Sequence, residues 1–142
     1  MLLLAFLLLA LVVATGCGGE DEADDRSAAT PAPKPATRLE LVAPNTGAGD
    51  FRYAQKRLEA PAGRAELVLT NDDVHQHDVR IQTGTRCCYV AGAKDAGGTD
   101  IISGGTTTKA LVDLKAGEYV FFCSVGSHAE DGMRGRLTVA AR

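Results

Sequence analysis

Three residues near the C-terminus have side chains that bind soft metal ions, and they stand at even intervals. Cys123, His128 and Met133 are five residues apart in a chain of 142 residues that holds only three His and two Met. The run Tyr119-Val-Phe-Phe-Cys123 predicts a strand whose core face includes Cys123. Two glycines in the following segment allow it to fold back tightly. One short loop can therefore present a thiolate, an imidazole and a thioether to one point.

Thiolate, imidazole and thioether form the ligand set of a blue-copper site, which requires a second imidazole. His77 can supply it, because it shares a predicted strand face with Val79 and Ile81 and should point inward. His75 has the same parity, so periodicity alone does not exclude it. It lies closer to the turn Asn71-Asp72-Asp73, and we expect it to be the more exposed. The alternative interpretation is a buried core thiol, a surface His and a Met that fills a gap.

Short alternating runs of apolar and polar residues predict strands, and no window shows the apolar spacing of a helix. We expect an all-β fold, a two-sheet antiparallel Greek-key sandwich. The expected strands cover residues 38–43, 51–60, 64–70, 76–83, 106–114, 118–123 and 135–141. Residues 84–105 break this rhythm. We expect them to cap one end of the sandwich or to add a short element.

The sequence resembles the cupredoxins, the small blue copper proteins that include plastocyanin, azurin and auracyanin. The resemblance covers most of residues 39–142, and the Cys-x4-His-x4-Met spacing is most similar to the auracyanin type. The flanks Leu114-Lys-Ala-Gly-Glu-Tyr and Gly132-Met-Arg-Gly-Arg-Leu-Thr-Val are also similar to the family. The resemblance implies one copper ion, with His77, Cys123 and His128 as strong ligands and Met133 as the long axial ligand.

Two positions depart from the usual sequence of this family. Asp78 stands where the family often has an Asn whose side chain braces the Cys-bearing loop, so this brace can differ here. Gly126-Ser127 replaces the frequent Pro-Gly before the second His, which leaves a less rigid loop.

The resemblance implies a one-electron carrier whose copper alternates between Cu(I) and Cu(II), acting with redox partner proteins at a membrane. The alternative is a protein that captures and delivers copper outside the cytoplasm, although a buried thiolate among four fixed ligands favours retention. We expect electrons to leave through the edge of His128. Small residues are expected around that ring, namely Ala48, Gly49, Gly126 and Gly132.

Several other functions are disfavoured by composition. Three His in total cannot furnish the additional sites of a multicopper oxidase or reductase, and no nucleophile or phosphate-binding motif occurs, so we expect no enzyme. The net charge of −3 offers no basic footprint for nucleic acid. We expect the protein to act as a monomer.

The N-terminal region predicts export and lipid attachment. Residues 1–13 are an unbroken apolar run, which at about 1.5 Å per residue is too short to cross a bilayer as a helix. Ala14-Thr15-Gly16 before Cys17 is similar to the lipobox of bacterial lipoproteins, so 1–16 is the expected signal peptide. No Lys or Arg precedes the run, and a short uncleaved membrane anchor is the alternative.

Residues 17–38 differ from both neighbouring regions, being first acidic and then rich in Pro. They predict a disordered tether between a lipid on Cys17 and the copper domain of residues 39–142. The domain would then lie outside the cytoplasm of a bacterium, on the periplasmic side of a membrane or on the outer cell surface.

Two of the four cysteines remain after lipid and copper are assigned. A strained disulfide between Cys87 and Cys88 is favoured in a secreted chain. Free thiols, or a second exposed metal site with His75, are the alternatives. In each case we expect Cys87 and Cys88 to lie outside the copper ligands.

Overall fold

The part of the chain that the structure describes is built from strands. The structure is a computed structural model, and it describes residues 35, 37–47 and 49–142. The expected signal peptide, Cys17 and most of the expected tether lie outside these residues. Within the described ranges, no helix is long and apolar enough to span a bilayer.

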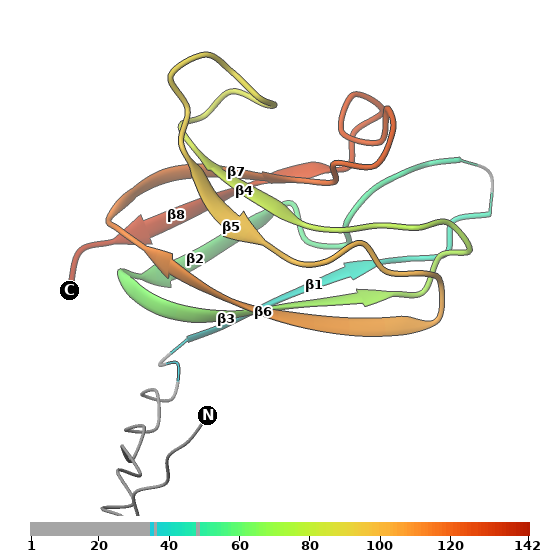
Figure 1. Ribbon diagram of the computed structural model, residues 1–142, viewed down its shortest axis with the longest axis horizontal. Coiled ribbons are helices and arrows are strands. Elements are labelled where there is room, and N and C mark those ends of the chain that lie inside the picture. Colours follow the sequence, from blue (N-terminus) through green and yellow to red (C-terminus); the bar gives the residue numbers. More distant parts are fainter. Residues whose placement is uncertain (1–34, 36, 48) are drawn as a thin grey trace, which may run out of the picture. The chain divides into compact units, whose positions relative to one another are not determined.

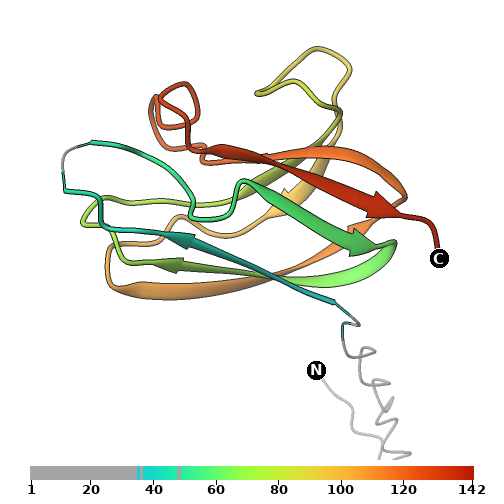
Figure 2. The same cartoon turned by 180° about the vertical axis from the view of Figure 1, so that it is seen from behind.

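Eight strands form two facing sheets (Figures 1 and 2). In chain order they are β1 (Thr37–Ala43), β2 (Arg57–Pro61), β3 (Gly63–Asn71), β4 (Arg80–Thr83), β5 (Asp95–Gly98), β6 (Thr106–Leu114), β7 (Gly117–Phe122) and β8 (Arg134–Ala140). One sheet has the order β1-β3-β6 and the other the order β2-β8-β7-β4-β5. The predicted all-β sandwich is therefore confirmed.

The core lies between the sheets and follows the alternation of the sequence. Residues at alternate positions of most strands are buried in one apolar cluster. Its members include Val79 and Ile81, which were expected to share a face, and three further pairs at alternate positions, Leu67 and Leu69, Tyr119 and Phe121, and Leu137 and Val139. Cys123 and Met133 belong to the same cluster, so the candidate ligands continue the apolar core.

The sheets are mixed, which corrects the expectation of antiparallel pairing throughout. β1 pairs with β3 in parallel, and β2 pairs with β8 in parallel. Parallel neighbours cannot be joined by a hairpin and need a crossover. β2 provides one: the chain leaves β1, runs back along the edge of the other sheet, and re-enters the first sheet in its original direction (Figure 2).

Two predicted strands are shorter than expected because other hydrogen bonds replace the sheet pairing. In the segment predicted as 51–60, only the residues from Arg57 onward form β2. Tyr53 is fully buried there and its hydroxyl donates to the carbonyl of Asp78. In the segment predicted as 76–83, His77 forms only an isolated bridge with Ile102, and pairing in β4 begins at Arg80.

Residues 84–105 add the short element that was one of the two expectations for them. β5 pairs antiparallel with β4 and extends the larger sheet. The loop before β5 carries Cys87 and Cys88 and rises above the sheet at the top of Figure 1. These two residues pack against a small apolar cluster of Val120, Phe122 and Ala129, which is separate from the main core.

Candidate metal centre

Three of the four predicted ligands meet inside one end of the sandwich. The Sγ atom of Cys123 lies 3.7 Å from Nδ1 of His77 and 3.6 Å from Nδ1 of His128. The two Nδ1 atoms are 3.2 Å apart. His77 and Cys123 are each 1% exposed and His128 is 9% exposed. Among the described residues, these three form the one group of His, Cys, Asp and Glu side chains close enough to share an ion.

The carboxylate of Asp73 fixes the ring of His77. Nε2 of His77 lies 2.9 Å from Oδ2 of Asp73. Burial alone would raise the pKa of Asp73, but hydrogen bonds from His77, the Val74 backbone and His75 outweigh it and lower the pKa overall. An ionised carboxylate accepts only, so Nε2 of His77 carries the proton and Nδ1 keeps a free lone pair. That lone pair faces the other two candidate ligands.

Asn71 holds the turn that presents His77. It is fully buried, and its Oδ1 accepts a hydrogen bond of 3.0 Å from the backbone N–H of Asp73. Its Nδ2 donates to the carbonyls of His75 and Ile102. The side chain of His75 is 49% exposed, with Nδ1 3.4 Å from Asp73. The structure therefore brings His77 into the cluster and leaves His75 at the surface, as expected.

The loop between Cys123 and Met133 is closed by backbone hydrogen bonds. The N–H of Cys123 donates to the carbonyl of Met133 over 3.0 Å, and the N–H of Met133 donates to the carbonyl of His128 over 2.8 Å. Gly126 and Gly132 have φ angles of 49° and 115°, which L side chains rarely adopt. The expectation that these glycines let the loop fold back is confirmed.

Asp78 braces the Cys-bearing loop although the family often has Asn at this position. Its Oδ1 accepts from the backbone N–H of Ser124 over 2.6 Å, and its Oδ2 accepts from the Ser124 hydroxyl. An Asn oxygen could accept only one of these bonds in the same way, because its second atom is a donor. The loop is therefore braced here by two hydrogen bonds between Asp78 and Ser124.

Burial sets the protonation of the two loop ligands when no metal is bound. It raises the pKa of the Cys123 thiol to about 11. Burial also lowers the pKa of His128, and the neighbouring His77 and His75 lower it further. The site therefore presents a neutral imidazole at neutral pH. A metal ion that binds Cys123 must displace the thiol proton.

Met133, the fourth predicted ligand, is placed by burial and by backbone hydrogen bonds. Its side chain is fully buried in the core cluster that also contains Cys123. Its backbone is hydrogen-bonded to both Cys123 and His128. The structure thus puts Met133 at the closing end of the ligand loop, where a thioether can act as a weak fourth ligand.

Phe51 is a contact of the candidate ligands that sequence reasoning missed. Its ring stacks on His128 with centroids 3.7 Å apart and 24° between the planes. It also meets His75 edge to face at 5.2 Å. The expectation that small residues surround His128 is therefore incomplete, and Ala48 lies outside the described residues. Phe51 lies before β2, in the part of the predicted strand 51–60 that forms no strand, so the expected alternation did not indicate its direction.

Cys87 and Cys88 are joined by a disulfide, the pairing favoured from the sequence. They lie in the loop above the outer face of the larger sheet, whereas Cys123 lies in the core between the sheets. Cys123 is the free cysteine among the described residues. The thiol available to a metal at this centre is therefore that of Cys123.

The donor set matches what a copper ion requires. Donors that each lie roughly 2 Å from a shared ion in a trigonal arrangement are about 3.5 Å apart. The three observed separations range from 3.2 to 3.7 Å. A thiolate with two imidazoles is also a combination of soft and intermediate ligands that suits copper. The residues present therefore fit a copper ion.

Solved structures with the same fold include three auracyanins, one of which is described by name as a blue copper protein. Auracyanin B superposes with a TM-score of 0.63 and 22% identity, over 75% of this chain and 91% of that one. Auracyanin from Roseiflexus castenholzii superposes with a TM-score of 0.61 and 20% identity, over 75% and 99%. Auracyanin A from Chloroflexus aurantiacus gives 0.60 and 16% identity, over 72% and 98%.

The fold also occurs within larger proteins. A copper nitrite reductase from Nitrosomonas europaea superposes with a TM-score of 0.54 and 18% identity, over 75% of this chain but 42% of the reductase.

A comparison with curated protein sequences finds no match. The sequence profile of the copper-binding proteins of the plastocyanin/azurin family matches residues 41–140. The chain therefore belongs to the plastocyanin/azurin family of copper-binding proteins, and a copper ion is its cofactor.

Proposed function

We propose that the protein is a one-electron carrier in which His77, Cys123 and His128 bind copper and Met133 is the weak fourth ligand. The observation that carries this proposal is the convergence of two imidazole nitrogens and a thiol sulfur within 3.7 Å of one another in a buried site. Copper bound by such ligands supplies a reversible change between Cu(I) and Cu(II). The family match supports the same function.

Hydrogen bonds from the chain itself position the candidate ligands. Asp73 orients His77, Asp78 ties the start of the ligand loop to the preceding segment, and backbone bonds close the loop at Met133. Cores packed in this way resist displacement of side chains. A site that keeps one geometry needs little rearrangement when its charge changes, which favours fast electron transfer.

His128 is the ligand through which we expect electrons to enter and leave. It is more exposed than His77 and stands on a loop at the end of the sandwich. Since Nδ1 faces the other donors, the opposite edge of the ring is directed away from them. Phe51 covers one face of the ring and keeps water from it. Redox partner proteins would approach at this edge, with the carrier acting as a monomer.

An enzyme is not supported by this arrangement. His75 is the only further His in the chain, and it stands at the surface rather than in the cluster. A second copper site of the kind that oxidases or reductases use would need several more imidazoles. The proposal is therefore restricted to electron transfer.

The test is an absorption spectrum and a voltammogram of the copper-loaded protein, followed by challenge with a modest chelator. A carrier gives an intense visible band, a reversible one-electron wave and slow loss of copper. A copper-delivery protein, the alternative function, would release the ion rapidly and show no reversible wave. That result would replace the proposed function.

We also propose that the protein is exported and anchored through a lipid on Cys17. The supporting observation is the apolar run 1–13 followed by Ala14-Thr15-Gly16-Cys17. Mass spectrometry of the membrane fraction should find an acylated peptide that begins at Cys17. Finding residues 2–16 still attached would show that the run is an uncleaved anchor.

A further inference from the structure

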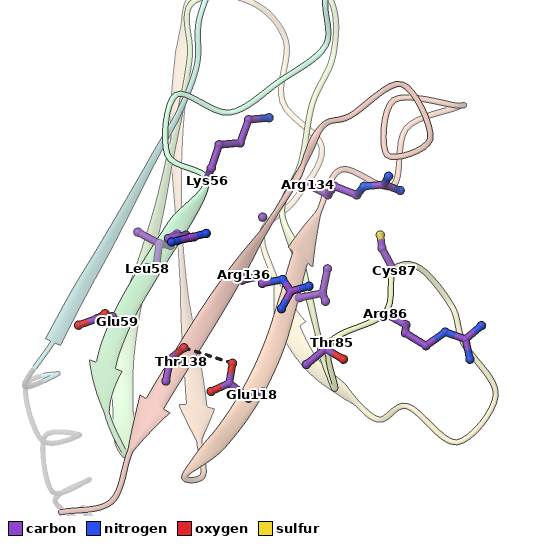
Figure 3. A pocket seen from close by; sticks show the side chains of 13 residues that line it. Lys56, Leu58, Glu59, Thr85, Arg86, Cys87, Glu118, Arg134, Arg136 and Thr138 are labelled. Atoms are coloured by element: carbon purple, nitrogen blue, oxygen red, sulfur yellow. Dashed lines mark hydrogen bonds between the residues drawn. The ribbon is translucent and has the colours of Figure 1, made fainter.

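A groove on the outer face of the larger sheet is lined by positive charge. It has a volume of about 950 Å³ and lies between β2, β8 and the loop that carries Cys87 (Figure 3). Five of its lining residues are cationic, namely Lys56, Arg57, Arg86, Arg134 and Arg136, and two are acidic, Glu59 and Glu118. The groove is therefore strongly positive in a chain whose net charge is −3.

Strand register places like charges opposite each other in this groove. Arg57 on β2 pairs directly with Arg136 on β8. Like charges in such positions destabilise a sheet. On the smaller sheet the register does the reverse, since Arg64 faces Asp113 and forms an ion pair with it at 3.2 Å. The two outer faces are thus built with opposite charge patterns.

The groove cations have no acidic partner among the described residues. The ion pairs that Lys and Arg form within the described residues all involve basic side chains outside the groove. Lys56 illustrates the crowding: burial lowers its pKa, and the charges of Arg52 and Arg134 lower it further. Among the described residues, the positive charge of the groove is therefore not paired.

Basic residues line the end of the groove that lies beside the ligand loop, and the acidic residues lie farther from that loop. Arg134 directly follows the candidate ligand Met133, and the ammonium group of Lys56 donates to the carbonyl of Gly132 over 3.1 Å. The acidic residues lie in the next row of the sheet, where Glu59 and Glu118 flank Thr138. Figure 3 shows Lys56 and Arg134 at one end of the groove and Glu118 with Thr138 at the other. The cationic half thus adjoins the ligand loop.

The shape and lining of the groove favour a protein segment over other anions. Its lining includes the apolar side chain of Val120 together with the Cys87 disulfide. A strand-like segment with alternating acidic and apolar residues can use both features. A bilayer surface is too flat to enter a groove. A nucleic acid duplex would meet the net negative charge of the rest of the chain.

We propose that the cationic half of this groove docks an acidic, extended segment of the redox partner protein. This inference rests on the proposed function, since it assumes that a partner exchanges electrons with the copper centre. A partner held there is oriented beside the ligand loop before transfer. Electrostatic attraction of this kind also speeds encounter and weakens as salt is added.

The test is a titration of the isotope-labelled full-length chain, followed by NMR, with a synthetic peptide that alternates Glu and Val. It is run with and without copper, so that failure of the redox function, seen in the voltammogram, stays separate from failure of docking. We expect shifts at Arg57, Arg134 and Arg136 that salt reverses. A peptide that alternates Lys and Val should give none.

Charge-reversed variants make the test specific. The double variant Arg57→Glu/Arg136→Glu should weaken peptide binding about tenfold or more. The matched control Lys94→Glu/Lys115→Glu makes the same change of charge outside the groove and should weaken it less than about twofold. An unchanged visible band shows that each variant is folded. Equal loss in both double variants, or shifts that map elsewhere, would overturn the proposal.

The same variants also test whether something other than an acidic protein segment binds in the groove. Sedimentation that shows a dimer, lost in Arg57→Glu/Arg136→Glu, would make a second copy of the chain the occupant. Binding to vesicles of phosphatidylserine and phosphatidylcholine that depends on Arg57 and Arg136 would point to a membrane. Either result would overturn docking of an acidic protein segment.

Discussion

The two segments that supply the candidate ligands are held in different ways. Residues 71–78, which carry His77, are held by side chains: Asn71 and Asp73 form hydrogen bonds that fix the turn and the imidazole. Residues 123–133 are held mainly by backbone bonds, which close the loop on itself at Met133. The first segment therefore depends on a few particular side chains, and the second on its length and its glycines.

Asp78 joins the two segments, because it follows His77 in the chain and binds Ser124 beside Cys123.

The difference between side-chain support in residues 71–78 and backbone support in residues 123–133 indicates how substitutions in each segment should act. Substitutions within the loop should alter copper chemistry through the ligands themselves. Substitutions in 71–78 should act through the position of one ring. The following variants separate these effects.

Loss of the thiolate should have the largest effect. Cys123→Ser replaces the sulfur ligand with a hydroxyl, which gives no intense sulfur-to-copper charge-transfer absorption at visible wavelengths. The absorption spectrum of the copper-treated variant should lack the visible band entirely. A retained band would mean that another sulfur, such as one of Cys87 or Cys88, binds the metal.

The two neighbouring His residues should behave oppositely. His77→Ala should weaken copper binding by more than the roughly 10–100-fold that loss of a residue supporting a ligand costs. His75→Ala should leave the visible band and the affinity almost unchanged, because its side chain is 49% exposed and outside the cluster. Competition titration against a chelator measures both variants. The reverse pattern would make His75 the ligand.

Removal of the carboxylate behind His77 should give an intermediate effect. Asp73→Ala frees the imidazole to turn, and a loss of about 10–100-fold in copper affinity is expected. Asp72→Ala, at the exposed neighbouring position, is the matched control and should change affinity little. Similar losses in both variants would show that the turn itself, rather than the Asp73 carboxylate, positions His77.

A change of the axial ligand should alter the reduction potential more than the affinity. Met133→Gln offers a harder oxygen donor, which favours Cu(II) and lowers the potential. The expected shift is about 59 mV for each tenfold gain in preference for Cu(II) over Cu(I). Voltammetry of the variant measures it. An unchanged potential would place Met133 outside the copper ligands.

The smallest effect is expected outside both segments. Cys87→Ser/Cys88→Ser removes a disulfide that packs on the outer face of the sheet, away from the core cluster of Cys123. The loop that it closes is minimal, so little stability should be lost. Copper stoichiometry and spectrum should be unchanged. Loss of the band in this variant would contradict the separation of the two cysteine sites.

The ligand loop could be predicted from the sequence because its geometry is local. Parity placed Cys123 in the core, and rare residues at short spacing placed His128 and Met133 near it. The alternation of apolar residues likewise predicted the long strands and the faces that they bury. These features depend on neighbours in sequence, which a single chain displays directly.

The features that the sequence did not predict depend on contacts between segments that are distant in the chain. Asn71 and Asp73 are typical turn residues, and nothing local shows that their side chains are buried and support His77. The direction of Phe51 and the parallel pairing of β1 with β3 depend on how loops cross between sheets. The pairing of Arg57 with Arg136 likewise required the strand register.

Anomalous diffraction at the copper absorption edge tests the central claim most directly. Crystals of the copper-loaded protein should show one anomalous peak between Nδ1 of His77, Sγ of Cys123 and Nδ1 of His128, with the Met133 sulfur as a more distant neighbour. A peak at His75, or at Cys87 and Cys88, would contradict the account of the site.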